Sequence, residues 1–246
     1  MSAPAIPRFR CISHSASNAF NLICFPHAGA SASFFQSWSD AVADCDVYAV
    51  CYPGRAERIA EPNPVDLINL ATDIAQGFNQ LNSKPLVFFG HSLGAPLAFE
   101  VARILEAKGK VLSHLFASGS RLGPLPPKSN YVAEDDDTIC KQLINMGGTT
   151  AELINDPLFK ELMLPAVRAD AKMFHHYEMA LTPMLMHCPV TTMVGDIDSH
   201  ADIRPWNQLT AASFSEKTVK GDHFYLISNP PFDILQNCLQ ATTVLA

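Results

Sequence analysis

The sequence predicts an α/β protein whose mostly parallel sheet carries helices on both faces. Short apolar runs alternate with longer amphipathic runs, which is the pattern of strands and helices in this class. The apolar runs are rich in β-branched or aromatic residues and have the length of buried parallel strands. With 246 residues, 48% of them hydrophobic, the chain is long enough to bury a sizeable core. We therefore expect residues 1–246 to form a single domain.

The first half of the chain supplies four expected strands with three helices between them. The strands are the apolar runs at residues 21–25, 46–52, 85–90 and 112–119. The helices are the amphipathic runs at residues 31–43, 65–81 and 95–109. Apolar residues recur at helical spacing in the second of these helices, at Leu67, Leu70, Ile74 and Phe78.

The alternation stops at Gly123, where a proline-rich linker with an acidic cluster begins. Only helices are expected next, over residues 137–148 and over residues 156–180, the second with a bend at Pro165. The remaining elements are two strands and a closing helix, at residues 188–196, 213–221 and 230–240. The sheet is thus interrupted by a helical insertion at residues 124–186. A long excursion of this kind is often a lid over a binding site.

Composition excludes several classes of partner. The formal net charge of −7 disfavours nucleic acid and anionic membranes, since both attract a basic surface. The chain has no apolar stretch of eighteen residues and no signal-peptide core at its start. Its seven cysteines are scattered, without a Cys-x-x-Cys motif, and are expected to be reduced and mostly buried. These features predict a cytoplasmic protein without a nucleic-acid or membrane partner.

The segment Gly-His-Ser-Leu-Gly at residues 90–94 lies between a buried strand and an amphipathic helix. A Gly-x-Ser-x-Gly pattern in this position is typical of a nucleophile elbow, a strained turn that presents a serine hydroxyl. Glycines at both ends remove side chains that would collide where strand turns into helix. The alternative is an ordinary tight turn with a capping serine. We expect Ser92 to be a nucleophile.

A serine nucleophile needs a base, and the base needs an orienting carboxylate. In proteins with a nucleophile elbow the carboxylate follows the serine in the chain and the histidine comes last. His223 lies in the loop after the last expected strand and is the expected base. Asp198, the third residue after the strand-ending Gly195, is the expected carboxylate. Asp196 is the alternative, although its position suits a cap on the loop backbone.

The negative oxygen of a tetrahedral intermediate also needs hydrogen-bond donors. One expected donor is the backbone N–H of Leu93, which follows the nucleophile. The other is the backbone N–H of Ala28, in the loop after the first central strand. Gly29 in that loop allows the unusual dihedral angles that aim an amide inward.

At this point the chain resembles a known family, the type II, or external editing, thioesterases of nonribosomal peptide and polyketide synthesis, members of the α/β-hydrolase superfamily. The matching segments are CFPHAGASASFFQSW at the start, the loop YPGRAERIAEP, the elbow FFGHSLGAPLAFEVAR, GGTTAEL and LPAVRADAKMFHHYE in the insertion, and GDHFYLI around the histidine. The resemblance covers about residues 20 to 235. Two positions depart from it: Ala30 stands where a second glycine is usual, and Ala171 where an aromatic residue is common.

The resemblance implies hydrolysis of acyl or aminoacyl thioesters on the phosphopantetheine arm of acyl or peptidyl carrier domains, which clears stalled or mis-primed synthases. It implies a Ser92–His223–Asp198 triad, with no metal or organic cofactor. Alternatives are a general carboxylesterase or acyl-CoA thioesterase, and a hydrolase-fold binding protein without catalysis. A cyclising terminal domain of a synthase is disfavoured because the chain begins with its own methionine and no carrier segment precedes it.

Two further expectations concern the insertion and the docking of a carrier domain. Some of the apolar residues of the insertion are expected to line a pocket over Ser92, the alternative being that they only pack on the sheet. These residues are Leu158, Leu162, Val167, Met173 and Phe174. Because carrier domains are generally acidic, local basic residues are expected to hold them. The candidates are Lys128, the lysines of the insertion, Arg55 and Arg58.

Overall fold

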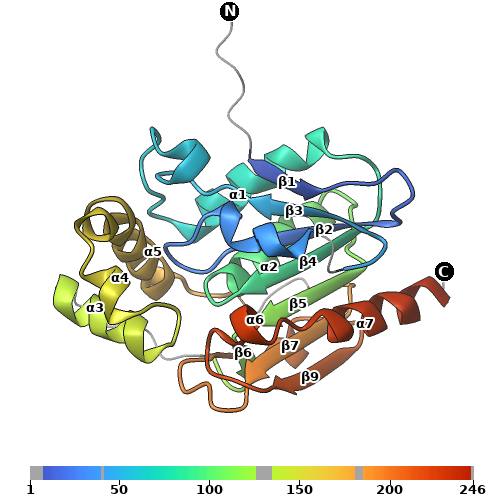
Figure 1. The fold of residues 1–246 in the computed structure, drawn as a ribbon. Coiled ribbons are helices and arrows are strands. Elements are labelled where there is room, and N and C mark those ends of the chain that lie inside the picture. Colours follow the sequence, from blue (N-terminus) through green and yellow to red (C-terminus); the bar gives the residue numbers. More distant parts are fainter. Residues whose placement is uncertain (1–7, 40–41, 126–134, 181–184, 245–246) are drawn as a thin grey trace, which may run out of the picture.

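The computed structural model describes residues 8–39, 42–125, 135–180 and 185–244 (Figure 1). A seven-stranded sheet in the order β1-β3-β2-β4-β5-β7-β9 forms its centre. The strands are β1 (Phe9–Ser13), β2 (Phe20–Phe25), β3 (Cys45–Val50), β4 (Leu86–His91), β5 (His114–Ser118), β7 (Val190–Gly195) and β9 (Phe214–Val219). All neighbouring strands are parallel except β1 and β3. The predicted strands are therefore present, and they form one mostly parallel sheet.

Helices cover both faces of the sheet, as the sequence predicts. Alternate residues of β2 face opposite sides, so that Ile23 lies in one core and Leu22 in the other. The first core packs under α1 (Leu67–Gly77) and α2 (Gly94–Glu106). The second packs under the 3₁₀ helix η1 (Ala32–Trp38) and the helices α6 (Tyr225–Ser228) and α7 (Phe232–Val244).

Within the described residues between β6 (Ser120–Leu122) and β7, the predicted insertion contains four helical elements. They are α3 (Asp136–Asn145), α4 (Ala151–Ile154), the π-helical turn η4 (Phe159–Met163) and α5 (Leu164–His176). These elements share a small apolar cluster of their own, made of Ile139, Cys140, Ile154, Phe159, Leu164 and Val167. In Figure 1 they lie together beyond the carboxyl ends of the central strands.

The structure differs from the prediction in three short strands. β1 is a five-residue edge strand of mixed polarity, so it lacks the continuous apolar signal of a buried strand. β6 pairs with β8 (Asp202–Arg204) in a separate two-stranded sheet, and each has only three residues. Strands of three residues are too short for an alternation of apolar and polar residues to be recognised in the sequence.

Two predicted helices also differ in type. The helix expected at residues 31–43 is the 3₁₀ helix η1, because its serine and aromatic residues are weak α-helix formers. The helix expected at residues 156–180 divides into η4 and α5, and Pro165 lies in the first turn of α5. Proline is tolerated there because its missing N–H would have no helical partner. The expected bend is thus a change of helix type one residue before Pro165.

Two composition-based expectations concern membranes and cysteines. Across the described ranges, no helix combines the length and apolar content needed to cross a bilayer. All seven cysteines are free thiols, and five of them are buried. Cys11 is exposed and Cys238 is half-buried. The expectation that the cysteines are mostly buried is confirmed.

Candidate active site

The strand order places the Ser92 loop and the Ala28 loop side by side. β3, the next strand in the chain after β2, lies beside β2 in the direction of β1. The strand after that, β4, lies beside β2 in the opposite direction. Ligands of open α/β sheets bind beyond the carboxyl ends of strands at such a switch point. β2 and β4 are parallel neighbours whose last paired residues are Phe25 and Gly90. The Ala28 loop follows β2 and Ser92 follows β4, so both lie at this point.

The turn at Ser92 has the geometry expected of a nucleophile elbow. Ser92 has φ +54°, in the left-handed region that costs a non-glycine residue about 1–2 kcal/mol. A Cβ atom on Gly90 would lie 2.1 Å from the carbonyl oxygen of Gly94, and one on Gly94 would lie 2.2 Å from that of Phe25. The Ser92 N–H donates to the carbonyl oxygen of Ser118 at 2.9 Å. Glycine at both positions allows strand, turn and helix to pack this closely.

His223 and Asp198 form a buried, hydrogen-bonded pair. The distance from His223 Nδ1 to Asp198 Oδ2 is 2.9 Å, and the two side chains are 3% and 0% exposed. An ionised carboxylate can only accept, so Nδ1 carries the proton and Nε2 keeps a free lone pair. The backbone N–H of His200 donates to Asp198 Oδ1 at 2.8 Å. Both oxygens of Asp198 are therefore occupied, which fixes the plane of its carboxylate.

The surroundings of Asp198 keep its carboxyl ionised. Burial alone would raise the pKa of Asp198, but the hydrogen bonds from His223 and the His200 amide, with Arg121 nearby, hold that pKa below its ordinary value. Arg121 Nη2 also donates to the Asp198 backbone oxygen at 2.8 Å. Arg121 follows β5, and nothing in the sequence pattern singled it out.

Asp196, the alternative carboxylate, has a different partner. Its side chain is exposed and accepts the backbone N–H of Gly221 at 2.8 Å. The Asp196 N–H donates to the carbonyl oxygen of Val219 at 2.8 Å. Asp196 thus joins the loop after β7 to the loop that carries His223, as its predicted capping position suggests, and Asp198 contacts the imidazole.

The two expected oxyanion donors are unoccupied amides. In the described ranges, neither the Ala28 N–H nor the Leu93 N–H has a hydrogen-bond acceptor. Leu93 is the N-cap residue of α2, whose thirteen residues direct the positive end of the helix dipole toward this region. Among the hydrogen bonds of the described residues, none joins Ser92 to His223. Such contacts often form only when substrate is bound.

Two further imidazoles, those of His91 and His27, lie near His223. The His91 ring lies 5.0 Å from the His223 ring, and its Nδ1 contacts Ser118 Oγ at 2.9 Å. Burial, with His223 next in importance, places the pKa of His91 well below its ordinary value. Burial and the same neighbour lower the pKa of His27, beside Ala28, to about 3. Both rings are thus neutral, and of the three imidazoles His223 is the one that contacts a carboxylate. Glycine at position 119 leaves room for two of these rings, because a Cβ atom there would lie 2.9 Å from His223 Cε1 and 3.0 Å from His91 Cε1.

A cavity of about 260 Å³ lies between the Ala28 loop and the insertion. Its walls come from the loop after β2, from the insertion and from Phe224, the neighbour of His223. The insertion contributes mainly apolar residues, namely Leu143, Leu153, Phe159, Met163 and Val167. An apolar cavity lined by Ala28, one of the two expected oxyanion donors, has the character of an acyl-binding pocket.

Of the five apolar insertion residues expected to line a pocket over Ser92 or to pack on the sheet, one lines this cavity, whose walls do not include Ser92, two pack in the core and two do neither. Val167 lines the cavity. Met173 is 1% exposed in the main core, and Phe174 packs against that core. Leu158 and Leu162 do neither and are exposed.

The expectation that Arg55 and Arg58 are surface charges for docking is wrong. They are 5% and 6% exposed. Arg55 is paired with Asp170, and Arg58 with Glu61 and Asp73. Their partners come mostly from other segments of the chain, which a single-segment reading does not reveal. Lys128 lies outside the described residues.

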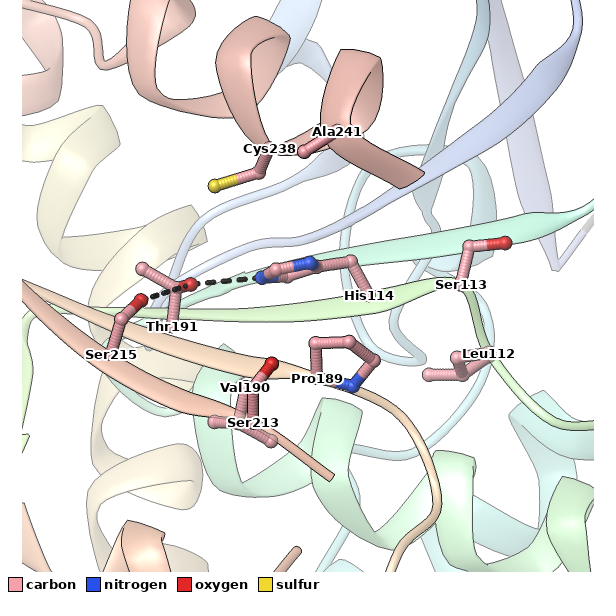
Figure 2. Close-up of a pocket in the computed structure, with 10 residues that line it drawn as sticks. All are labelled: Leu112, Ser113, His114, Pro189, Val190, Thr191, Ser213, Ser215, Cys238 and Ala241. Atoms are coloured by element: carbon pink, nitrogen blue, oxygen red, sulfur yellow. Dashed lines mark hydrogen bonds between the residues drawn. The ribbon is translucent and has the colours of Figure 1, made fainter. Parts of the chain in front are cut away.

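A second cavity, of about 510 Å³, lies at the amino end of the sheet (Figure 2). Figure 2 shows His114 Nε2 in contact with Thr191 Oγ1, which in turn contacts Ser215 Oγ, both at 2.8 Å. Helix α7 contributes Cys238 and Ala241 to this cavity. Burial lowers the pKa of His114 to about 4, so this imidazole is neutral. In the described part of the chain, no group of three or more His, Cys, Asp or Glu residues could hold a metal ion.

The fold and the Ser92, Asp198 and His223 geometry define a hydrolase of the α/β class. The thioesterase domain family matches residues 20–241, and the chain belongs to that family. The protein is therefore a thioesterase. The resemblance to type II thioesterases and the expected α/β-hydrolase fold are confirmed by the relatives described next.

Three relatives illustrate the similarity. The "Probable cadicidin biosynthesis thioesterase" of Streptomyces griseus is 37% identical over 85% of this chain and 59% of its own length. The "S-acyl fatty acid synthase thioesterase, medium chain" of Rattus norvegicus is 30% identical over 95% of this chain and 93% of its own length. The solved structure of the type II thioesterase BorB, from the borrelidin biosynthetic cluster, has a TM-score of 0.81 and 33% identity, and covers 94% of this chain and 97% of BorB.

Proposed function

We propose that this thioesterase hydrolyses acyl or aminoacyl groups from the phosphopantetheine arm of carrier domains in the cytoplasm. In this role it clears stalled or mis-primed nonribosomal peptide or polyketide synthases. One observation carries the catalytic part of the proposal. It is the 2.9 Å contact between Asp198 and His223, which lies at the carboxyl ends of the strands, as the strained Ser92 does. The similarity to a type II thioesterase from a biosynthetic cluster supports the substrate class.

In the proposed first half-reaction, Ser92 Oγ attacks the thioester carbon while His223 Nε2 takes the hydroxyl proton. Asp198 holds the imidazole with Nδ1 protonated and stabilises the charge that develops on it. The N–H groups of Ala28 and Leu93 donate to the carbonyl oxygen as it becomes negative. The carbon–sulfur bond then breaks, and the His223 proton passes to the departing sulfur. A thiol pKa of roughly 8.5 makes the thiolate a good leaving group.

In the proposed second half-reaction, water replaces the thiol. His223 removes a proton from the water as its oxygen attacks the acyl-serine, and the same two amides stabilise the second intermediate. The carbon–oxygen bond to Ser92 breaks, and the proton on His223 returns to Ser92 Oγ. The products are a free carboxylic acid and the regenerated enzyme, and the cycle needs no metal or organic cofactor.

Residues 1–246 are proposed to act as one domain in which the insertion, residues 124–186, is the lid. Its cavity-lining residues place an apolar wall beside Ala28, where the acyl group would extend once Ser92 carries it as an ester. Because the protein carries a net charge of −7, local cations must attract an acidic carrier domain. The exposed lysines of the insertion, Lys141, Lys160 and Lys172, are the proposed contacts.

The carrier proposal is tested by comparing one acyl group on a carrier protein, on coenzyme A and on a small thiol. We expect the highest kcat/KM for the carrier protein. Exchanging Lys141, Lys160 and Lys172 for glutamate should lower kcat/KM for the carrier substrate alone. Glutamate at Lys108 and Lys110, which are exposed beyond the far end of α2, is the matched control and should leave kcat/KM unchanged for all three substrates. Equal kcat/KM for all three substrates would contradict carrier recognition.

A general acyl-CoA thioesterase or carboxylesterase is the second candidate. It is favoured by the similarity to a medium-chain fatty acid synthase thioesterase and by the apolar lining of the cavity. Equal turnover of carrier-bound, coenzyme A and simple ester substrates would support it. A protein without catalysis would fail to react with a serine-directed phosphonate, whereas the proposed enzyme becomes labelled at Ser92.

A further inference from the structure

A buried ion pair connects the insertion to the loop after β3, and its carboxylate also contacts the loop that follows β2. Asp170 lies in α5, and Arg55 lies in the loop after β3; their side chains are 1% and 6% exposed. The contacts are bidentate, with Arg55 Nη1 at 2.5 Å from Asp170 Oδ2 and Nη2 at 2.8 Å from Oδ1. Asp170 Oδ2 also accepts the backbone N–H of Gly29 at 2.8 Å. The carboxylate therefore contacts the loop that carries one of the proposed oxyanion donors.

The Gly29 contact fixes the peptide plane next to that donor. The Ala30 N–H donates to the His27 carbonyl oxygen at 3.1 Å, which closes a four-residue turn. Gly29, the third residue of this turn, has φ +76°, as a type II turn requires. Asp170 accepts from the central peptide, between Ala28 and Gly29, and so holds its orientation. The neighbouring peptide carries the Ala28 N–H, whose direction depends on the same turn.

The loop is also held on both flanks of this contact. Val167 lies one turn before Asp170 on the same face of α5, and a Cβ on Gly29 would lie 2.3 Å from Val167 Cγ2. The Tyr52 hydroxyl donates to the Pro26 carbonyl oxygen at 3.0 Å. Helix α5 thus packs directly against the turn, and the turn has little freedom to rotate.

Two considerations separate a positioning role from a purely structural one. Apolar residues can often replace a buried ion pair without loss of stability, so stability alone does not explain a pair at this position. An apolar residue at position 170 could not accept the Gly29 N–H, however. An isolated carboxylate there would oppose the negative charge that develops on the substrate oxygen, and Arg55 neutralises it. Both members are therefore needed if the loop is to stabilise an oxyanion.

We propose that Asp170 is a positioning residue for the oxyanion donor Ala28 N–H, and that Arg55 neutralises and orients its carboxylate. This inference rests on the proposed roles of Ser92 and the Ala28 N–H. Arg55 belongs to the YPGRAERIAEP motif and Asp170 to the LPAVRADAKMFHHYE motif, and the proposed catalytic mechanism gives neither motif a role. Asp170 and Arg55 act through the loop and do not contact the reacting atoms.

The primary test is Asp170→Asn, which keeps the shape of the side chain. Its single oxygen cannot serve both Gly29 and Arg55 as the carboxylate does. We expect kcat to fall about 10²-fold, the scale of a lost oxyanion donor, with KM changed less than threefold. A trifluoromethyl ketone thioether, which adds Ser92 and forms an oxyanion, should bind about 10²-fold more weakly. The matching thioether without the reactive ketone should bind equally well to both proteins.

The second variant, Arg55→Lys, keeps the charge but loses the bidentate geometry. It should show a smaller loss of the same kind, and it serves as the test if Asp170→Asn does not fold. The matched control is Asp46→Asn. Asp46 is buried and ion-paired with Lys84 at 2.7 Å, but it lies at the start of β3, the opposite end of that strand. Asp46→Asn should lower the unfolding temperature without changing kcat per active site.

Active sites are counted by phosphonate labelling, so that a smaller folded fraction is not mistaken for slower turnover. The inference is overturned if Asp170→Asn and Arg55→Lys behave as Asp46→Asn does, losing stability but keeping kcat and ketone affinity. It is equally overturned if both ketone and thioether affinities fall together, since that would indicate a collapsed pocket. A wild-type enzyme that cleaves small thioesters but ignores carrier proteins would contradict the proposed function and leave this inference intact.

Discussion

Exchanging Asp198 for asparagine should remove the base from the reaction by reversing the tautomer of His223. Asparagine offers one oxygen and one amide group where the carboxylate has two acceptors. If the oxygen faces His223, the amide group meets the His200 N–H, and two donors are left facing each other in a part-buried position, at a cost of up to about 1–3 kcal/mol each. The opposite orientation is therefore preferred. In it the amide donates to His223 Nδ1, so the proton moves to Nε2.

An imidazole with its proton on Nε2 cannot accept the Ser92 proton. The same tautomer error in a serine protease lowers kcat about 10⁴-fold, which corresponds to about 5.5 kcal/mol. We expect a loss of that order for Asp198→Asn with a small acyl thioester as substrate. Asp196→Asn is the matched control: its side-chain oxygen can still accept the Gly221 N–H, so kcat should change less than about threefold.

The assay is steady-state kcat on protein whose active sites have been counted, together with proton NMR of the downfield Nδ1 signal of His223. That signal should be present in the wild type and in Asp196→Asn, and absent in Asp198→Asn. Thermal unfolding should show that both variants are folded. The reasoning is refuted if Asp198→Asn keeps kcat within tenfold of the wild type, or if Asp196→Asn is the more damaging change.

Three other predictions follow from the structure. Ser92→Ala and His223→Ala should each lower kcat at least several thousand-fold without unfolding the protein, and residual turnover within tenfold of the wild type would sink the proposed mechanism. Because the pKa of His114 is about 4 when folded and about 6.5 when unfolded, only the unfolded chain binds this proton between those values, so stability falls as the pH drops from 6.5 toward 4. His114→Gln should shrink the difference in unfolding free energy between pH 7.5 and pH 5 by about 2 kcal/mol in urea titrations, and an unchanged difference would exclude this imidazole as the cause. In hydrogen exchange, α5 should be better protected than α3, because Asp170 anchors α5 while few residues of α3 are buried; equal rates would contradict this anchoring.

The parts of the fold that the sequence predicted are those with a repeating local signal. Strands β2 and β4 are continuous apolar runs because both faces of the sheet are covered, and their bounds were predicted within one or two residues. β6 and β8 could not be found in the same way. Each exists because Ser120 pairs with Asp202, a contact between distant segments that leaves no local pattern.

The site shows the same division. Ser92, Asp198 and His223 could be proposed from the sequence because each lies in a loop that follows a recognisable strand. The environments of Arg55 and Asp170 depend on approaches across the fold, so Arg55 was wrongly expected on the surface. One sequence signal was available for Asp170. It lies three residues after Val167 and three before Met173, on the apolar face of α5, where a carboxylate requires a buried partner.

The contact between Asp170 and the Gly29 amide means that the insertion and the loop after β2 must be exchanged together if their fit is to be kept. Protein engineers who wish to alter acyl preference would naturally transplant the insertion of one thioesterase onto the scaffold of another. Such a chimera would also exchange the helix that holds the oxyanion loop, so selectivity and rate would change together. A graft that ends before α5, or one that carries the loops of Gly29 and Arg55 along with it, should separate the two properties.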